Sequence, residues 1–130
     1  MNSSAIEIYC KDIEKWPESW KIVKQDIKCG NKIVESVFIT FIEFIIDKGL
    51  SRKTIKKHID NLWLLGGEII DRVNRDEELR KLEPKLLVQK FIDDEGGPYS
   101  RHIDTEAEIK FFDSTCKKLF KFMKIQLRSV

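Results

Sequence analysis

Cysteine and histidine are scarce in this 130-residue chain, which contains three cysteines and two histidines. The cysteines, Cys10, Cys29 and Cys116, are odd in number and form no C-x-x-C pair. Neither histidine, His58 or His102, stands at metal-ligand spacing from a cysteine. Disulfides and structural zinc are therefore not expected, and the sequence predicts a reduced, cytoplasmic protein without a metal or other cofactor. Cys116 falls on a predicted core face, where it would act as a small buried hydrophobe.

Long apolar runs are missing as well. The most apolar stretch, residues 33–46, is too short to span a bilayer, and Glu35 and Glu43 interrupt it. The first four residues contain no basic region followed by an apolar run, so neither a signal peptide nor a membrane partner is expected. The formal net charge of +2 is too small to predict nucleic-acid binding by itself, so only the distribution of charge is informative.

The sequence also lacks the motifs of common catalytic sites: a glycine-rich phosphate loop, G-x-S-x-G and H-E-x-x-H. His58 lies at the edge of an apolar arc and is interpreted as a boundary residue rather than a catalytic base. Asp93, Asp94 and Glu95 precede a glycine pair and indicate a solvated turn rather than a metal site. The protein is therefore not expected to be an enzyme.

Strand signals are absent, because apolar and polar residues do not alternate and hairpin dipeptides are missing. The helical periodicity predicts an all-α fold, a compact single-domain bundle of five or six helices over residues 1–130. We expect an N-terminal helical layer in residues 1–30 and the main bundle in residues 31–130. Pro17 suits the first turn of a helix in that layer, and Gly30 is expected to end the layer.

The organising element is a helix over Ile33–Asp47 that is apolar nearly all round and therefore belongs inside the bundle. Gly49 is expected to end it, and Ser51 to cap a second helix. The second helix should bury Trp63 beside aliphatic residues and should kink or break at Gly66-Gly67. A capping box, Thr105 with Glu108, opens a well-patterned last helix.

Two basic stripes stand out on the helices. One comprises Arg52, Lys53, Lys56 and Lys57, and the other Lys110, Lys117, Lys121, Lys124 and Arg128. Residues 67–108 instead carry 12 acidic and 7 basic residues, so charge is segregated along the chain. A segregated basic face can neutralise phosphates with release of counterions. Lysines that only solubilise amphipathic helices would give the same stripes.

The pattern F-x-x-F-I-x-x-x-G-L-S-x-x-T-I-x-x-H-I-x-x-L over residues 41–62 resembles the start of the SAM-like core-binding domain of tyrosine recombinases (phage integrases). Residues 86–92 and 112–123 are similar to the closing helices of that domain. The resemblance implies a four-helix-type core and DNA contact through Arg52, Lys53, Lys56 and Lys57. The recombinase catalytic domain has no counterpart in this sequence, so strand transfer is not implied.

Residues 51–59 also resemble the recognition helix of a helix-turn-helix regulator. Ile45 counts against this alternative, because such motifs usually place a small residue four positions before the turn glycine. Residues 65–70 and 112–123 look like uncharacterised small bacterial proteins, a likeness that implies no activity.

The leading hypothesis is a non-enzymatic DNA-binding module that contacts the phosphate backbone. Its expected contact residues are Arg52, Lys53, Lys56, Lys57, Lys117, Lys121, Lys124 and Arg128. The alternative is a protein-interaction or assembly module without DNA binding, which would use the acidic middle or a contact loop formed by Tyr99, Arg101 and His102. A deep pocket that gathered these three loop residues would instead favour an enzyme.

Overall fold

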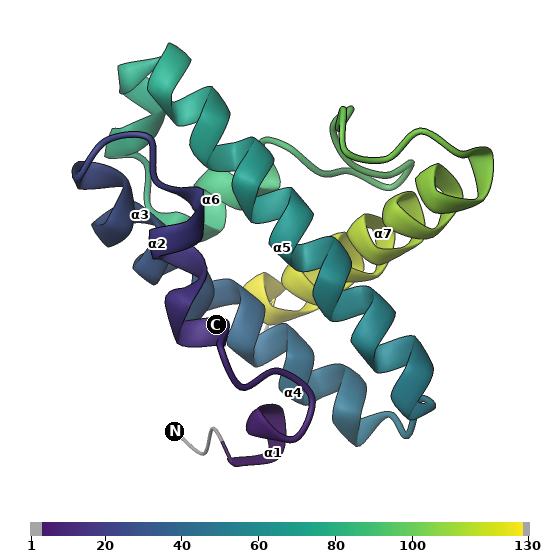
Figure 1. The fold of residues 1–130 in the computed structure, drawn as a ribbon. Coiled ribbons are helices and arrows are strands. Elements are labelled where there is room, and N and C mark those ends of the chain that lie inside the picture. The colour runs from purple at the N-terminus through teal and green to yellow at the C-terminus, as the bar shows by residue number, and fades with distance from the viewer. Residues whose placement is uncertain (1–3, 129–130) are drawn as a thin grey trace.

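The computed structural model describes residues 4–128, and the side chains of residues 5–125. In this part of the chain the regular structure is helical apart from an isolated bridge between Asp93 and Gly96, so the predicted all-α fold is confirmed (Figure 1). The elements in chain order are α1 (Ser4–Glu7), η1 (Ile13–Lys15), α2 (Trp16–Trp20), α3 (Gln25–Ile33), η2 (Val34–Phe38), α4 (Ile39–Asp47), α5 (Arg52–Arg75), η3 (Glu77–Lys81), α6 (Pro84–Gln89) and α7 (Glu106–Arg128).

The apolar helix is longer than expected, because α3, the π-helical η2 and α4 form one continuous helix from Gln25 to Asp47. The expected helix end at Gly30 is therefore wrong. Gly30 instead lets α2 pack closely, since a Cβ there would lie 2.9 Å from the Cβ of Pro17. The apolar character is explained by burial, because the seven most buried side chains of η2 and α4 are all apolar: Val34, Val37, Phe38, Ile39, Phe41, Ile42 and Ile45.

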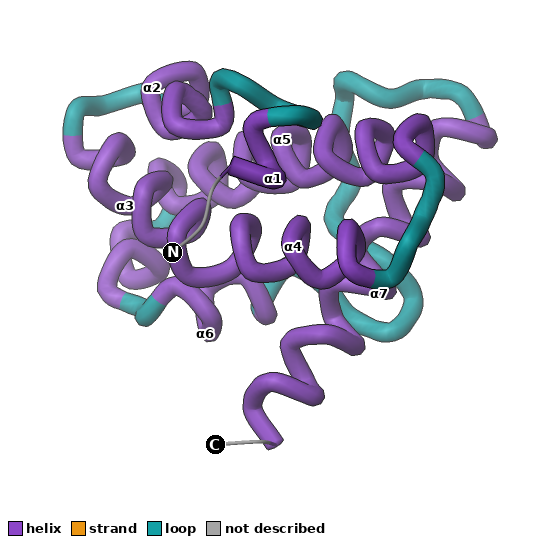
Figure 2. Tube along the Cα trace, turned by 90° about the horizontal axis from the view of Figure 1, so that it is seen from below, coloured by secondary structure: helices purple, strands orange, loops and turns teal. Residues whose placement is uncertain are grey.

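The turn between α4 and α5 follows the sequence prediction. Gly49 has φ +77°, the left-handed conformation that glycine adopts readily at a helix end. Ser51 caps α5, since its Oγ accepts a hydrogen bond of 3.2 Å from the Thr54 backbone N–H. Both views place α4 alongside α5 (Figures 1 and 2).

α5 is continuous from Arg52 to Arg75, so a break at Gly66-Gly67 is wrong. Gly66 makes room for a neighbour, because a Cβ there would overlap the ring of Trp20. The Trp20 indole N–H donates to the backbone oxygen of Trp63 at 3.0 Å. Trp63 itself is 41% exposed, which contradicts its expected burial. Its indole N–H donates to Ser19 Oγ at 3.0 Å, and this bond holds the ring at the surface.

Two aromatic clusters pack in and against the largely aliphatic core. Trp16, Trp20 and Phe38 pack with ring centroids 5.8–6.3 Å apart. Phe41, Phe44 and Phe122 join α4 to α7, with centroids 4.7–6.4 Å apart. α7 begins at the predicted capping box, where Thr105 Oγ1 accepts from the Glu108 backbone N–H at 3.1 Å, and it buries Cys116 as expected. In Figure 2 the last turns of α7 extend away from the other helices.

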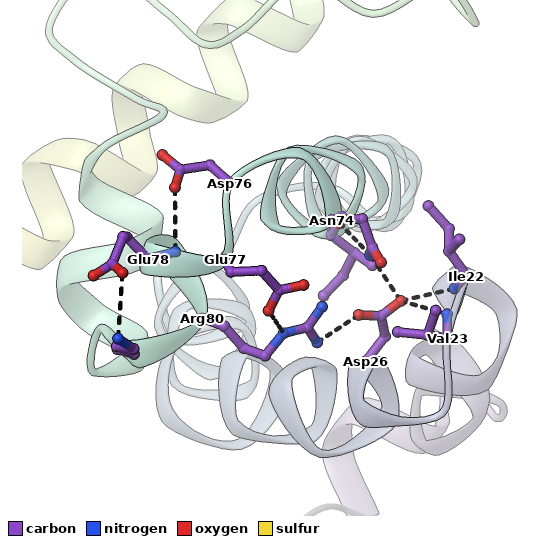
Figure 3. A network of polar contacts seen from close by, with 10 residues as sticks. Ile22, Val23, Asp26, Asn74, Asp76, Glu77, Glu78 and Arg80 are labelled. Atoms are coloured by element: carbon purple, nitrogen blue, oxygen red, sulfur yellow. Dashed lines mark hydrogen bonds and ion pairs between the residues drawn. The ribbon is translucent and has the colours of Figure 1, made fainter.

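The buried carboxylate of Asp26 joins three elements (Figure 3). Its Oδ2 accepts hydrogen bonds from the backbone N–H groups of Ile22 and Val23, at 2.8 and 2.9 Å, and from the Asn74 amide at 2.9 Å. Its Oδ1 accepts from the Arg80 guanidinium at 2.8 Å. Although burial raises the pKa of Asp26, these hydrogen bonds hold it below its ordinary value. The network fixes the start of α3, the end of α5 and η3 relative to one another.

None of the helices in the described chain has the length and apolar character that a bilayer span requires.

Candidate functional site

The first two turns of α5 carry four exposed cations, Arg52, Lys53, Lys56 and Lys57, which we call the α5 cations. No carboxylate of the described residues forms an ion pair with them, and the first turn of α5 contains no acidic residue. The positive end of the helix dipole adds to their potential. The arrangement can therefore attract an anion without first breaking a salt bridge.

Aromatic rings order two of the α5 cations. The Arg52 guanidinium lies 5.8 Å from the ring centroid of Tyr9, and the Lys57 ammonium 5.3 Å from that of Phe111 on α7. Such cation–π contacts limit the freedom of a long side chain while its charge stays accessible. The buried face of the same helix, with Ile55 at its centre, anchors the row to the core.

The second predicted row is on α7. Lys117, Lys121 and Lys124, which we call the α7 cations, are exposed, and none forms an ion pair with a described carboxylate. Lys110 differs, since it pairs with Glu106 at 3.6 Å. The side chain of Arg128 lies outside the described residues.

The described contacts do not join the two rows into one cluster. Lys57 meets α7 at Phe111, and Lys117 and Lys121 lie about 9 Å and about 15 Å further along that helix at the usual rise per residue. The second half of α7 is instead attached to α4, through Phe122 and Phe44 with centroids 4.7 Å apart. The α5 cations are therefore the compact site, and of the α7 cations Lys121 and Lys124 lie further from the Lys57 contact than Lys117 does.

A pocket of about 440 Å³ lies between α2, α5 and the loop at residues 99–102. It gathers all three residues of the predicted contact loop, which sequence reasoning could not place against α5. The residues that line it are Ser19, Trp20, Ile22, Trp63, Leu64, Gly67, Glu68, Asp71, Arg72, Arg75, Tyr99, Arg101 and His102. We call it the Trp63 pocket.

The acidic turn at residues 93–97 holds this loop in place. Asp93 Oδ1 accepts from the backbone N–H groups of Glu95 and Gly96, at 2.8 and 3.1 Å. The Gly97 N–H donates to Asp113 Oδ1 on α7 at 3.1 Å. Asp93 thus stabilises an exposed turn. No cluster of three or more potential metal ligands occurs among the described residues.

A second pocket of about 400 Å³ adjoins the first and shares Leu64 with it. Its other lining residues are Lys57, Asp60, Asn61, Ile103, Ala107, Glu108 and Phe111. Lys57, Leu64 and Asp71 are spaced seven residues apart, so both pockets follow one face of α5 from the α5 cations toward its C-terminal end. The seven-residue spacing in the sequence indicates this face of α5, but it does not indicate which segments form the other side of the two pockets.

The pocket does not assemble a catalytic pair in the described residues. No hydrogen bond joins the His102 ring or the Tyr99 hydroxyl to another described side chain, and its one ion pair joins Arg75 and Asp71 at 3.0 Å. A nucleophile and base within hydrogen-bonding reach would be the usual sign of covalent catalysis. That the protein is not an enzyme stays a prediction.

His58 is fully buried, so its interpretation as a boundary residue is wrong. Its Nδ1 lies 2.7 Å from Thr115 Oγ1, and its ring centroid 5.0 Å from that of Phe111. Burial, with a smaller effect from the charge of Lys118, lowers the pKa of His58 to about 4. The side chain therefore links α5 to α7 as a neutral group.

The burial of neutral His58 predicts a loss of stability in mild acid. Its folded pKa of about 4 lies below the ordinary 6.5, so the unfolded chain binds the proton more readily. The contribution of His58 to the free energy of unfolding is therefore largest above pH 6.5 and is lost as the pH drops toward 4. The free energy of unfolding should decrease by about 2 kcal/mol between about pH 7.5 and pH 5, measured by urea denaturation.

Two variants test the assignment to this histidine. His58→Leu should be nearly insensitive to pH across that interval, whereas His102→Gln, on the exposed loop, should keep the dependence of the wild type. An unchanged slope in His58→Leu would assign the pH dependence to another group.

Comparison with known proteins found no match among family models, curated proteins or solved structures. The resemblance to recombinase core-binding domains therefore stays a prediction.

Proposed function

We propose that the protein binds duplex DNA through the phosphate backbone, with the α5 cations as the principal contact. The observation that carries the proposal is the exposure of four cations in the first two turns of a capped helix, without an ion pair to a described carboxylate. Charges held in this way can release counterions from DNA, which is the main source of sequence-independent affinity.

The residues that surround the α5 cations restrict their movement, which favours a rigid contact with DNA. Arg52 and Lys57 lie over aromatic rings, and the opposite face of α5 is buried against the core. Less conformational entropy is lost on binding when the side chains are already restricted. The α7 cations would reach a different stretch of backbone. Phosphate contacts orient a protein on DNA without selecting a sequence, so no sequence preference is proposed.

Replacing Lys53, Lys56 and Lys57 together by alanine should weaken binding to a duplex by about tenfold or more at low salt. The slope of log affinity against log salt should fall by about three, one for each lost phosphate contact. Fluorescence anisotropy with a labelled duplex at about 50 and 200 mM salt measures both quantities.

The matched control replaces three lysines of the acidic region, Lys81, Lys85 and Lys90, by alanine. This variant has the same change in net charge and should bind almost as the wild type does. Equal losses in both variants would indicate a general charge effect, and the absence of binding by the wild type at low salt would reject the proposal.

A protein-interaction or assembly module is the second candidate. Ile22, Val23 and Trp63 are exposed, with 59%, 40% and 41% of their surfaces accessible, and Ile22 lines the same pocket as Trp63. Tryptophan and arginine are frequent among the residues that dominate the binding energy of protein interfaces, and both line the Trp63 pocket. A defined dimer in light scattering, together with no affinity for duplex DNA, would favour this function.

A further inference from the structure

We infer that the Trp63 pocket binds an unpaired nucleobase, so that single-stranded nucleic acid is a second ligand of this protein. The inference rests on the proposed nucleic-acid function and names a ligand class for a different site from the α5 cations. It is carried by the combination of exposed aromatic rings, arginines and a cavity of about 440 Å³.

The aromatic part of the pocket is built for stacking. The Trp63 indole N–H is bonded to Ser19, so the ring offers its surface rather than a hydrogen-bond donor. The Trp20 indole N–H donates a hydrogen bond to the backbone oxygen of Trp63 and so helps to hold this residue in position. Tyr99, with 76% of its surface exposed, lines the pocket from the loop. Bases of any sequence stack on such rings.

Arginines supply the charge beside the rings. Arg72, Arg75 and Arg101 line the pocket, and of its two carboxylates Asp71 is already paired with Arg75. Arg72 and Arg101 form no ion pair with a described carboxylate, so they can bind the phosphates that flank a stacked base. The remaining carboxylate, Glu68, can accept a hydrogen bond from an exocyclic amino group of a base.

The position of the pocket connects it with the proposed DNA contact. Trp63 lies about 9 Å along α5 from Lys57, at the usual rise per residue. Lys57 lines the neighbouring second pocket, and Leu64 lines both pockets. Because the two pockets adjoin, a strand that contacts Lys57 is close enough to place one base in the Trp63 pocket.

The test uses the full chain and a labelled oligothymidine of about ten nucleotides, within the usual site size for single strands. An abasic phosphodeoxyribose strand of the same length is the matched probe. The wild type should bind oligothymidine more tightly than the abasic strand, with quenching of tryptophan fluorescence. Trp63→Leu and Tyr99→Ala should each weaken oligothymidine binding at least about fivefold, and Trp63→Phe should retain most of it.

The abasic probe and the duplex separate the possible failures. Equal affinity for oligothymidine and the abasic strand, or oligothymidine binding unchanged in Trp63→Leu and Tyr99→Ala, would overturn the inference. Tyr99→Ala keeps the test decisive if Trp63→Leu unfolds on thermal scanning. If the inference is overturned in this way but duplex binding is lost only in the Lys53/Lys56/Lys57 variant, the proposed function still stands. Base-dependent binding at Trp63 without duplex binding would support this inference and reject the duplex function.

Discussion

Replacing Asp26 by alanine should lower the free energy of unfolding by about 3–5 kcal/mol, measured by urea denaturation at neutral pH. The carboxylate is fully buried and accepts four hydrogen bonds, one of them from the Arg80 guanidinium, whose side chain is 17% exposed. Its removal leaves a largely buried positive charge and two backbone N–H groups without their acceptor. Such groups carry the full cost of desolvation.

Arg80 and its second partner provide the controls. Glu77→Ala removes an exposed acceptor at 3.1 Å and should cost less than about 1 kcal/mol. Adding Arg80→Met to Asp26→Ala should restore part of the stability, because the unpaired charge is then absent. A loss below about 1 kcal/mol in Asp26→Ala would mean that the network in Figure 3 does not hold α3, α5 and η3 together.

Features that depend on neighbouring residues could be predicted from the sequence. Gly49 ends α4, Ser51 caps α5 and Thr105 caps α7, as expected. Each depends on hydrogen bonds or backbone conformation within about one helical turn, so the local residue types determine it. The exposure of the α5 cations follows in the same way from the 3.6-residue period and the apolar residues between them.

The role of two glycines could not be predicted, because it depends on a distant residue. Local rules take Gly30 and Gly66 as points where a helix ends or bends. Both instead lie within helices, Gly30 against Pro17 of α2 and Gly66 against Trp20 of α2, where a larger side chain would not fit. Trp63 was expected in the core beside the aliphatic residues of the same helix. Its bond to Ser19, which no local pattern indicates, places it at the surface.

The candidate sites differ in the same way: one depends on neighbouring residues and the other on contacts between distant segments. The lysine rows were identified from helical spacing alone, whereas the Trp63 pocket exists only because the loop at residues 99–102 returns to α5. That return depends on the Gly97 hydrogen bond to Asp113 and on the close contact of Gly97 with Cys116. These are contacts between segments that a single sequence does not pair. The pocket is therefore the part of the site that required the structure.

Replacing Phe41 by alanine should lower the free energy of unfolding by about 3–5 kcal/mol, the usual range for removing a buried aromatic ring. Phe41 is fully buried, and its centroid lies 5.7 Å from that of Phe122 on α7. Tyr99→Ala, which removes an exposed ring, should change stability by no more than about 0.5 kcal/mol in the same urea titration. A loss below about 1 kcal/mol in Phe41→Ala would place this ring outside the core. The α5 cations would then lack the rigid helix pair that holds them in position, and both proposed nucleic-acid contacts would lose their structural support.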